Sequence, residues 1–144
     1  MAEMLLTYRG VVYPHQCDHM GHMNVMWYVG KFDEATWQMF AAFGLDAETL
    51  RTHGWGIAAT RQELSYRQEL HAGDALSIHT RVVAIRPRQI KFYHEMVKDK
   101  SSAVSSACAI TGLLIDIQTR KPALFPAFAL QAAQSCLIEK PLLV

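Results

Sequence analysis

One segment of the chain carries the apolar spacing of a long α-helix. Between Val25 and Phe43, apolar residues recur at every third or fourth position, which is the period of a helix with a buried face. Asn24 precedes this run as a natural N-cap, and Gly44 follows it as a natural stop. A narrow stripe holds the polar positions, which are Lys31, Glu34 and Gln38. The pattern predicts a helix over residues 25–43 that is largely enclosed.

The remaining pattern alternates between apolar and polar residues with the period of two that is typical of β-strands. It predicts strands at residues 8–13, 58–70, 76–84, 90–96 and 102–117. Pro14 ends the first strand, and residues 71–74 form a turn between the second and third strands. Residues 86–88 separate the third strand from the fourth. The chain after about Pro126 is expected to be a short tail.

This order of one strand, one helix and four strands predicts the fold class α+β. A single long helix and an antiparallel meander bury each other most simply when the twisted sheet curls round the helix. Residues 1–144 contain no repeat or Pro/Gly-rich linker, so they are expected to form one domain. Such a sheet leaves an edge strand that a second chain can pair with. We therefore expect a homodimer at least.

Composition narrows the classes of function. Fourteen Lys and Arg against thirteen Asp and Glu give a net charge of +1, so no broad basic surface is available for nucleic acid. No apolar stretch approaches the roughly 20 residues that span a bilayer, and we expect no membrane association. Three widely spaced cysteines do not indicate a disulfide framework, so a cytoplasmic location is expected. A chain of 144 residues also leaves no room for a separate cofactor domain.

The loop at residues 15–24, directly before the predicted helix, carries the candidate chemistry. Free backbone N–H groups and the positive end of the helix dipole gather at a helix N-terminus and favour developing negative charge. Asp18 could there attack or activate water while a helix N–H holds the oxyanion. The plainer alternative is that Asp18 only caps the loop or stabilises the helix.

The same loop has a metal-binding interpretation. It supplies four donors of types that Zn²⁺ accepts, namely His15, Cys17, His19 and His22. Alternate positions on an extended loop point to opposite sides, and no second His/Cys cluster completes a ligand shell. We therefore expect no metal, and we interpret the loop histidines as hydrogen-bonding or packing residues.

The stretch CDHMGHMNVMWYVGKFDEATW resembles the D-x-x-G-H-x-N…Y…F-(D/E)-E-A signature of the hotdog-fold acyl-CoA thioesterases. The resemblance is to the branch that is similar to 4-hydroxybenzoyl-CoA thioesterase, and it extends over nearly the whole order of elements. It implies a hotdog fold, in which a curved antiparallel sheet wraps one central helix. It also implies hydrolysis of a thioester, and a thioester is activated enough to need neither metal nor cofactor.

The resemblance also implies roles for particular residues. Asp18 becomes the catalytic carboxylate, either as a nucleophile or as a general base for water. The backbone N–H of Val25 polarises the thioester carbonyl, and Gly21 allows close backbone approach. His22 and Asn24 shape the loop and cap the helix.

Further from the loop, the resemblance implies sites that a second subunit would complete. In some hotdog branches an acidic residue at the position of Glu63 joins the site of the neighbouring subunit, although Glu63 could equally be a solvated strand residue. Arg86, Arg88 and Lys91 fall where this branch meets the CoA phosphates, although three cations also fit a solvated turn. A homodimer, assembled further into a dimer of dimers, is the expected state.

The acyl group stays open between aromatic, short-chain and betainyl types. The sequence DHMGHMN, followed by WY and FDEATW, also resembles the betainyl-CoA thioesterase subgroup. Aromatic faces would hold a quaternary ammonium group, and four are available: Trp27, Tyr28, Trp37 and Trp55. Aromatic residues at helical spacing are more commonly core residues. His15, Gln16 and the bulky Met26–Trp27 pair depart from the branch's usual pattern, which leaves the substrate open.

Two other functions compete with the thioesterase. A hotdog dehydratase would use a similar tunnel, but the spacing from Asp18 to His22 and the lack of a hydratase-type motif argue against it. A non-catalytic acyl-CoA binding or sensing module would share the fold and bind the same ligand without turnover.

Overall fold

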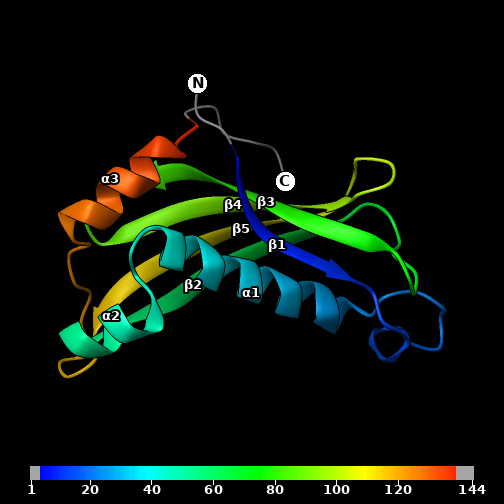
Figure 1. Ribbon diagram of the computed structural model, residues 1–144. Helices are drawn as coiled ribbons and strands as arrows, with labels where there is room; N and C mark the ends of the chain where they lie inside the picture. The colour runs from blue at the N-terminus through cyan, green and yellow to red at the C-terminus, as the bar shows by residue number, and fades with distance from the viewer. Residues whose placement is uncertain (1–3, 139–144) are drawn as a thin grey trace.

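Five strands form one antiparallel sheet in the order β1-β3-β4-β5-β2. The computed structural model describes residues 4–138 (Figure 1). The strands are β1 (Leu5–Val11), β2 (Trp55–Tyr66), β3 (Ala75–Ile85), β4 (Gln89–Lys98) and β5 (Ala103–Asp116). The helices are the 3₁₀ turn η1 (Pro14–Gln16), α1 (Val25–Ala42), α2 (Ala47–His53) and α3 (Ala127–Ser135). No helix within residues 4–138 is long and apolar enough to cross a membrane.

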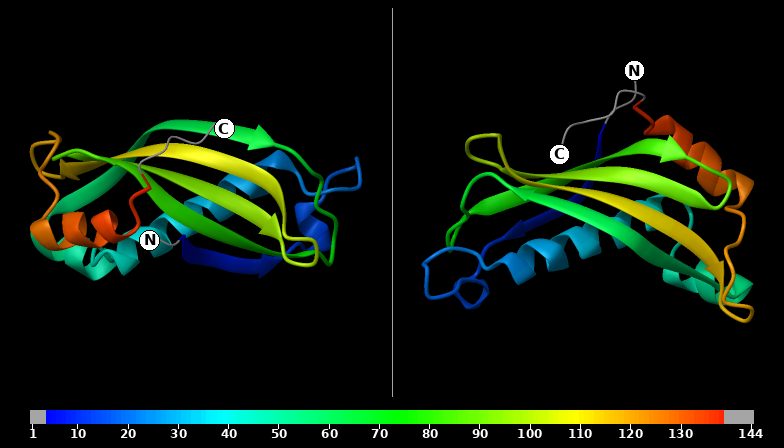
Figure 2. Two further views of the ribbon diagram at one scale, coloured as in Figure 1. Left: turned by 90° about the horizontal axis from the view of Figure 1, so that it is seen from above. Right: turned by 180° about the vertical axis from the view of Figure 1, so that it is seen from behind.

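The core lies between α1 and the face of the sheet that it crosses (Figure 2). Alternation along β4 places Phe92 on this face, where its ring meets Phe40 of α1 at a centroid distance of 5.7 Å. Phe125, from the segment before α3, also stacks on Phe40, with 6.3 Å between the ring centroids. These contacts confirm the predicted α+β architecture, in which a curved antiparallel sheet packs on one long helix.

The strand boundaries differ from the prediction where pairing partners decide them. The first strand was expected at residues 8–13, but β1 begins at Leu5, because it pairs with β3 from Leu5 opposite Thr80 to Val11 opposite Ala75. The second was expected at residues 58–70, but β2 ends at Tyr66. Beyond Tyr66 the next two backbone N–H groups both turn to the carbonyl of Ser105, which takes the chain out of the regular ladder.

Two short helices are absent from the sequence prediction. The seven residues of α2 are too few for a clear period, although Asp46 caps the helix by accepting a hydrogen bond from the Thr49 N–H at 2.8 Å. The segment expected to be a short tail after Pro126 instead forms α3, which buries Ala129 and Ala133. Both helices lie at the end of the sheet away from η1 (Figure 1).

The prediction that α1 is largely enclosed is wrong for the single chain. The sheet covers only one side of the helix, and Met26, Val29 and Trp37 are 64%, 39% and 44% exposed. Trp37 lies beside the edge strand β2, with which it lines a small cavity. Lys31, expected in the polar stripe, is buried, and its Nζ donates to the Tyr8 hydroxyl at 2.9 Å. Periodicity cannot separate a surface covered by the same chain from one left open.

A buried histidine, His94, links α1 to two strands of the sheet beneath it. The His94 ring on β4 lies 2.6 Å from the Thr80 hydroxyl through Nδ1 and 2.9 Å from the Thr36 hydroxyl through Nε2. Since the Thr36 hydroxyl already donates to the Phe32 carbonyl, Nε2 carries the proton and Nδ1 accepts. The Thr80 hydroxyl lies 2.8 Å from the Thr7 hydroxyl of β1, and this contact extends the chain of hydrogen bonds. Burial lowers the pKa of His94 to about 3.

This histidine makes the stability of the fold sensitive to acid. Because the folded pKa of about 3 lies below the ordinary value of 6.5, the contribution of neutral His94 is complete above pH 6.5 and is lost as the pH falls toward 3. Each unit below 6.5 costs about 1.4 kcal/mol. Urea unfolding should show the wild type losing about 2–3 kcal/mol between pH 6.5 and 4.5 relative to His94→Gln. If the free energy of unfolding of the two proteins changes with pH in parallel, this assignment is wrong. The control is His53→Gln, which changes an exposed histidine.

Candidate active site

Backbone hydrogen bonds fix the loop between η1 and α1. Cys17 and Met23 form an isolated antiparallel bridge, and the Met23 N–H donates to the Leu70 carbonyl at 2.7 Å. Within the loop, the Gly21 N–H donates to the Asp18 carbonyl at 3.0 Å, and Gly21 has φ of +87°. Only glycine takes this conformation without strain. Nothing described lies within 4 Å of where a Gly21 Cβ would be, so crowding does not require a glycine here. The positive φ of the turn requires it.

Asp18 is tied to the start of α1 through Asn24. The Asn24 amide donates to Asp18 Oδ2 at 2.8 Å, and Asn24 Oδ1 accepts from the Met26 N–H at 3.0 Å, which is the predicted N-cap. The Met20 N–H donates to the other carboxylate oxygen, Oδ1, at 2.8 Å. The Asn24 hydrogen bond above all, then the Met20 bond and the nearby His22, lower the pKa of Asp18. Asp18 is therefore an anion at neutral pH, held beside the helix N-terminus.

The first residue of α1 presents a free hydrogen-bond donor at the same place. Val25 is 55% exposed, and among residues 4–138 its N–H donates to no other group. A first-turn N–H has no partner within its own helix and carries part of the positive end of the helix dipole. An anionic carboxylate and a backbone N–H without a partner among the described residues thus lie on either side of one turn of the chain.

A cavity of about 220 Å³ opens directly beside Val25. It runs between the first turn of α1 and the end of β2, where the Tyr28 and Tyr66 rings meet edge to face at 5.3 Å. Its lining residues are His22, Met23, Val25, Tyr28, Tyr66, Arg67, Gln68 and Glu69.

The aromatic residues of the sequence prediction do not converge on this cavity. Of the four, only Tyr28 lines it. Trp27 packs its ring edge to face with His15 at 5.4 Å, and Trp55 stacks on His53 at 4.4 Å near the end of α2. Trp37 lies further along α1. Tyr66 and Glu69 line the cavity instead, and neither carried a recognisable motif.

Glu63 and Lys91 lie on the face of the sheet that α1 does not cover. Together with Arg61 they line a separate cavity of about 150 Å³. Glu63 pairs with Arg61 there, with 2.5 Å between Oε1 and Nη2. Within one chain neither residue meets Asp18.

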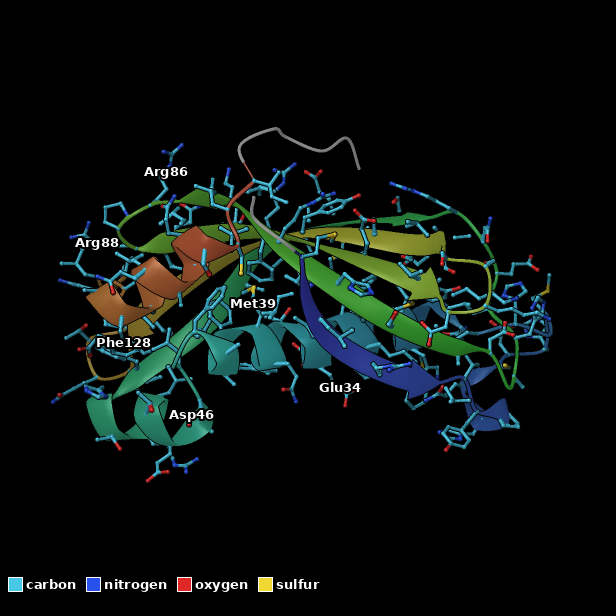
Figure 3. The ribbon with its side chains drawn as sticks, turned by 45° about the horizontal axis from the view of Figure 1, so that its top comes forward. Glu34, Met39, Asp46, Arg86, Arg88 and Phe128 are labelled. Carbon is cyan, nitrogen blue, oxygen red and sulfur yellow. The ribbon has the colours of Figure 1, made fainter. Side chains whose placement is uncertain are left out.

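Arg86 and Arg88 lie at the far end of the sheet from the loop. The Val12 N–H donates to the Asp74 carbonyl, so β3 begins beside the loop, and its eleven residues then run roughly 35 Å to the turn that holds both arginines. Figure 3 shows the two side chains near α3, away from the loop at the other end. Contact with the same ligand as Asp18 would require a second chain.

The four donors of the metal-binding interpretation do not form a ligand shell. Among residues 4–138, no three His, Cys, Asp or Glu side chains gather in a way that could hold a metal ion.

Comparison with known sequences decides the family. Residues 12–133 match the model of the thioesterase-like superfamily. The chain belongs to the thioesterase-like superfamily. One relative of this thioesterase-like chain is the betainyl-CoA thioesterase of Pseudomonas aeruginosa, 24% identical over 96 residues. That match covers 67% of this chain and 60% of the relative, so the chain spans less than two thirds of the relative's length.

Two solved protein structures share the fold of this chain. The Staphylococcus aureus protein SAV2348, solved in complex with CoA, superposes with a TM-score of 0.89 over 100% of this chain and 90% of its own, at 15% identity. The 1,4-dihydroxy-2-naphthoyl-CoA thioesterase of Synechocystis superposes with a TM-score of 0.80 over 90% of this chain and 95% of its own, at 17% identity. These likenesses confirm the hotdog fold that the sequence predicts.

Proposed function

We propose that this thioesterase-like protein hydrolyses acyl-CoA thioesters at the N-terminus of α1. The observation that carries the proposal is the tether of ionised Asp18 to Asn24, beside the free Val25 N–H and the mouth of the cavity. Membership of the superfamily supports it, as do two relatives that are CoA thioesterases and one solved with CoA.

In this mechanism the thioester carbonyl oxygen accepts a hydrogen bond from the Val25 N–H. This hydrogen bond stabilises the negative charge that develops on the oxygen during attack. Asp18 acts in one of two ways. As a nucleophile it forms a mixed anhydride and expels the CoA thiolate, and water then cleaves the anhydride. As a general base it removes a proton from the water that attacks the carbonyl. A single turnover in ¹⁸O water separates these routes, because label in Asp18 itself excludes a purely general-base route.

The acyl group is proposed to be small and of aromatic, short-chain or betainyl type. The cavity volume of about 220 Å³ supports a small group, and the names of the two thioesterase relatives cover an aromatic and a betainyl ester. A panel of the three ester types, with released thiol as the readout, tests the proposal. We expect rapid release from at least one type. Rates that match buffer for every ester would overturn it.

Arg86, Arg88 and Lys91 are proposed to bind the CoA phosphates of a site to which another chain contributes Asp18. Arg88→Ala should raise KM for the CoA ester several-fold, because one charge-assisted phosphate contact is lost. Steady-state kinetics with a short thioester that lacks the nucleotide should show little change. Equal effects on both substrates would contradict the assignment.

The second chain is proposed to be another copy, which covers the open side of α1 and pairs with the edge strand β2. Gly30 supports this surface. It lies on the exposed side of α1, and nothing described lies within 4 Å of where a Gly30 Cβ would be, although glycine costs a helix about 0.5–1 kcal/mol relative to alanine. A close approach by a second helix would explain it. We also propose a dimer of dimers, in which Glu63, on the face of the sheet that α1 does not cover, joins the site of a neighbouring subunit.

We predict that Gly30→Ala weakens the dimer, because its Cβ would collide with the second copy. Sedimentation velocity across a dilution series should show a larger monomer fraction than for wild type. Gln38→Ala, on the β1 side of the same helix, is the matched control and should leave the distribution unchanged. If Gly30→Ala simply stabilises an unchanged assembly, α1 is not the contact.

A further inference from the structure

We propose that Gln16 is a positioning residue for thioester hydrolysis. It acts through Asn24, which holds both Asp18 and the start of α1. The inference rests on the proposed function and adds to it a residue that touches neither the substrate nor the reacting atoms. In the sequence Gln16 stands out because it departs from the usual pattern of the branch. In the structure it is only 8% exposed, whereas residues 13–15 and 19–21 on either side are exposed.

The Gln16 side chain ties the active-site loop to the sheet. Its Oε1 accepts a hydrogen bond from the Tyr13 N–H at 3.0 Å, and the Gln16 N–H donates to the Tyr13 carbonyl at 2.9 Å. These two reciprocal bonds close the η1 turn. Tyr13 follows Val12, whose N–H donates to the Asp74 carbonyl at 2.9 Å. The turn is therefore held at the corner where β1 ends and β3 begins.

The Gln16 backbone connects this corner to Asn24. The Gln16 carbonyl accepts a hydrogen bond from the Asn24 N–H at 2.9 Å. The Asp18 N–H donates to the His22 carbonyl at 3.2 Å, on the other side of the isolated bridge within the loop. Gln16 thus lies directly opposite Asn24 in a short antiparallel pairing. The position of the Asn24 backbone depends on the turn that the Gln16 side chain closes.

Asn24 sets the positions of both reactive groups. Its side-chain amide donates to Asp18 Oδ2 at 2.8 Å, so it orients the carboxylate. The Val25 N–H belongs to the planar peptide group that joins Asn24 to Val25, so its direction follows the Asn24 backbone. A shift of Asn24 therefore moves the carboxylate and the N–H donor together. A misplacement of roughly 1 Å at a reacting group can lower a rate by up to about 10².

Two substitutions separate the acceptor at Gln16 from the bulk of its side chain. Methionine has a similar length, but its sulfur is a weak acceptor. Among residues 4–138 the Tyr13 N–H has no other acceptor, so Gln16→Met leaves it unpaired. We expect Gln16→Met to lower kcat about tenfold and to leave KM within a factor of about two, because no substrate contact is removed. Gln16→Glu keeps an acceptor oxygen and should restore kcat to within about threefold of wild type.

A double-mutant cycle tests whether Gln16 acts through Asn24. In an Asn24→Ala background the tether to Asp18 is already lost, so Gln16→Met should lower kcat by no more than about twofold further. Gln38→Met is the matched control, since it removes the same amide from an exposed position on α1. Equal losses of kcat in both backgrounds overturn the inference. A Gln16→Met enzyme with wild-type kcat also overturns it, as does a Gln16→Glu enzyme as slow as Gln16→Met.

Hydrogen exchange of the Asn24 N–H tests the same positioning without turnover. NMR of the full chain should show that Gln16→Met speeds this exchange about tenfold and that Gln16→Glu returns it toward the wild-type rate. An exchange rate that Gln16→Met leaves unchanged overturns the inference. If no CoA ester is hydrolysed, the proposed function fails separately, and the exchange rates still decide whether Gln16 holds Asn24.

Discussion

Asp18→Asn is expected to lower kcat for a CoA ester by about 10²–10⁴, which is the usual contribution of a positioned base or nucleophile. The asparagine amide can neither attack the carbonyl nor remove a proton from water. One of the two hydrogen bonds that Asp18 accepts, from Met20 and from Asn24, must also be lost, at a cost of about 1 kcal/mol in stability. Released thiol measures the rate, and equilibrium binding should show that the ester still binds.

The matched control is His19→Gln, an exposed change one residue along the same loop. It should leave kcat within a factor of about two, because surface changes away from a site have small effects. An Asp18→Asn enzyme that keeps more than a tenth of its kcat would show that Asp18 only caps the loop, which is the plainer interpretation of the sequence.

Val25→Pro should lower kcat by about 10²–10³, the usual effect of removing one oxyanion donor. Proline lacks the N–H, yet the first position of a helix tolerates it. Asn24 has φ of −71° and ψ of 148°, a conformation that the residue before proline readily takes. The Val25 side chain is 55% exposed, so its loss costs little packing. Kinetics with released thiol and circular dichroism of the helix content test the prediction together.

Val25→Ala is the control, since it keeps the N–H and removes the same side chain. It should retain nearly full kcat. If Val25→Pro keeps both its helix content and its kcat, the oxyanion donor lies elsewhere.

The sequence predicts well what neighbouring residues decide. The bounds of α1 follow from its period, its Asn24 cap and the stop at Gly44, and the structure agrees to within one residue at each end. The last three strands are likewise close, because alternation and turn residues mark them. The position of Asp18 beside the helix start also follows from chain order alone.

What distant pairing decides could not be predicted. The start of β1 depends on its partner β3, and the burial of Lys31 depends on Tyr8 from another strand. The separation of Arg88 from Asp18 depends on the direction of β3. Glu69 reaches the cavity only because the chain leaves the β2 ladder after Tyr66. None of these arrangements leaves a periodic signal or a motif.

We propose that this chain turns over CoA esters rather than only binding them. The most direct test measures binding and thiol release with one CoA ester on the same preparation of the full chain. We predict many turnovers per chain for the wild type, with free acid and CoA formed in equal amounts, and binding without turnover for Asp18→Asn. A wild type that binds the ester and leaves it intact would identify an acyl-CoA binding module and contradict the account.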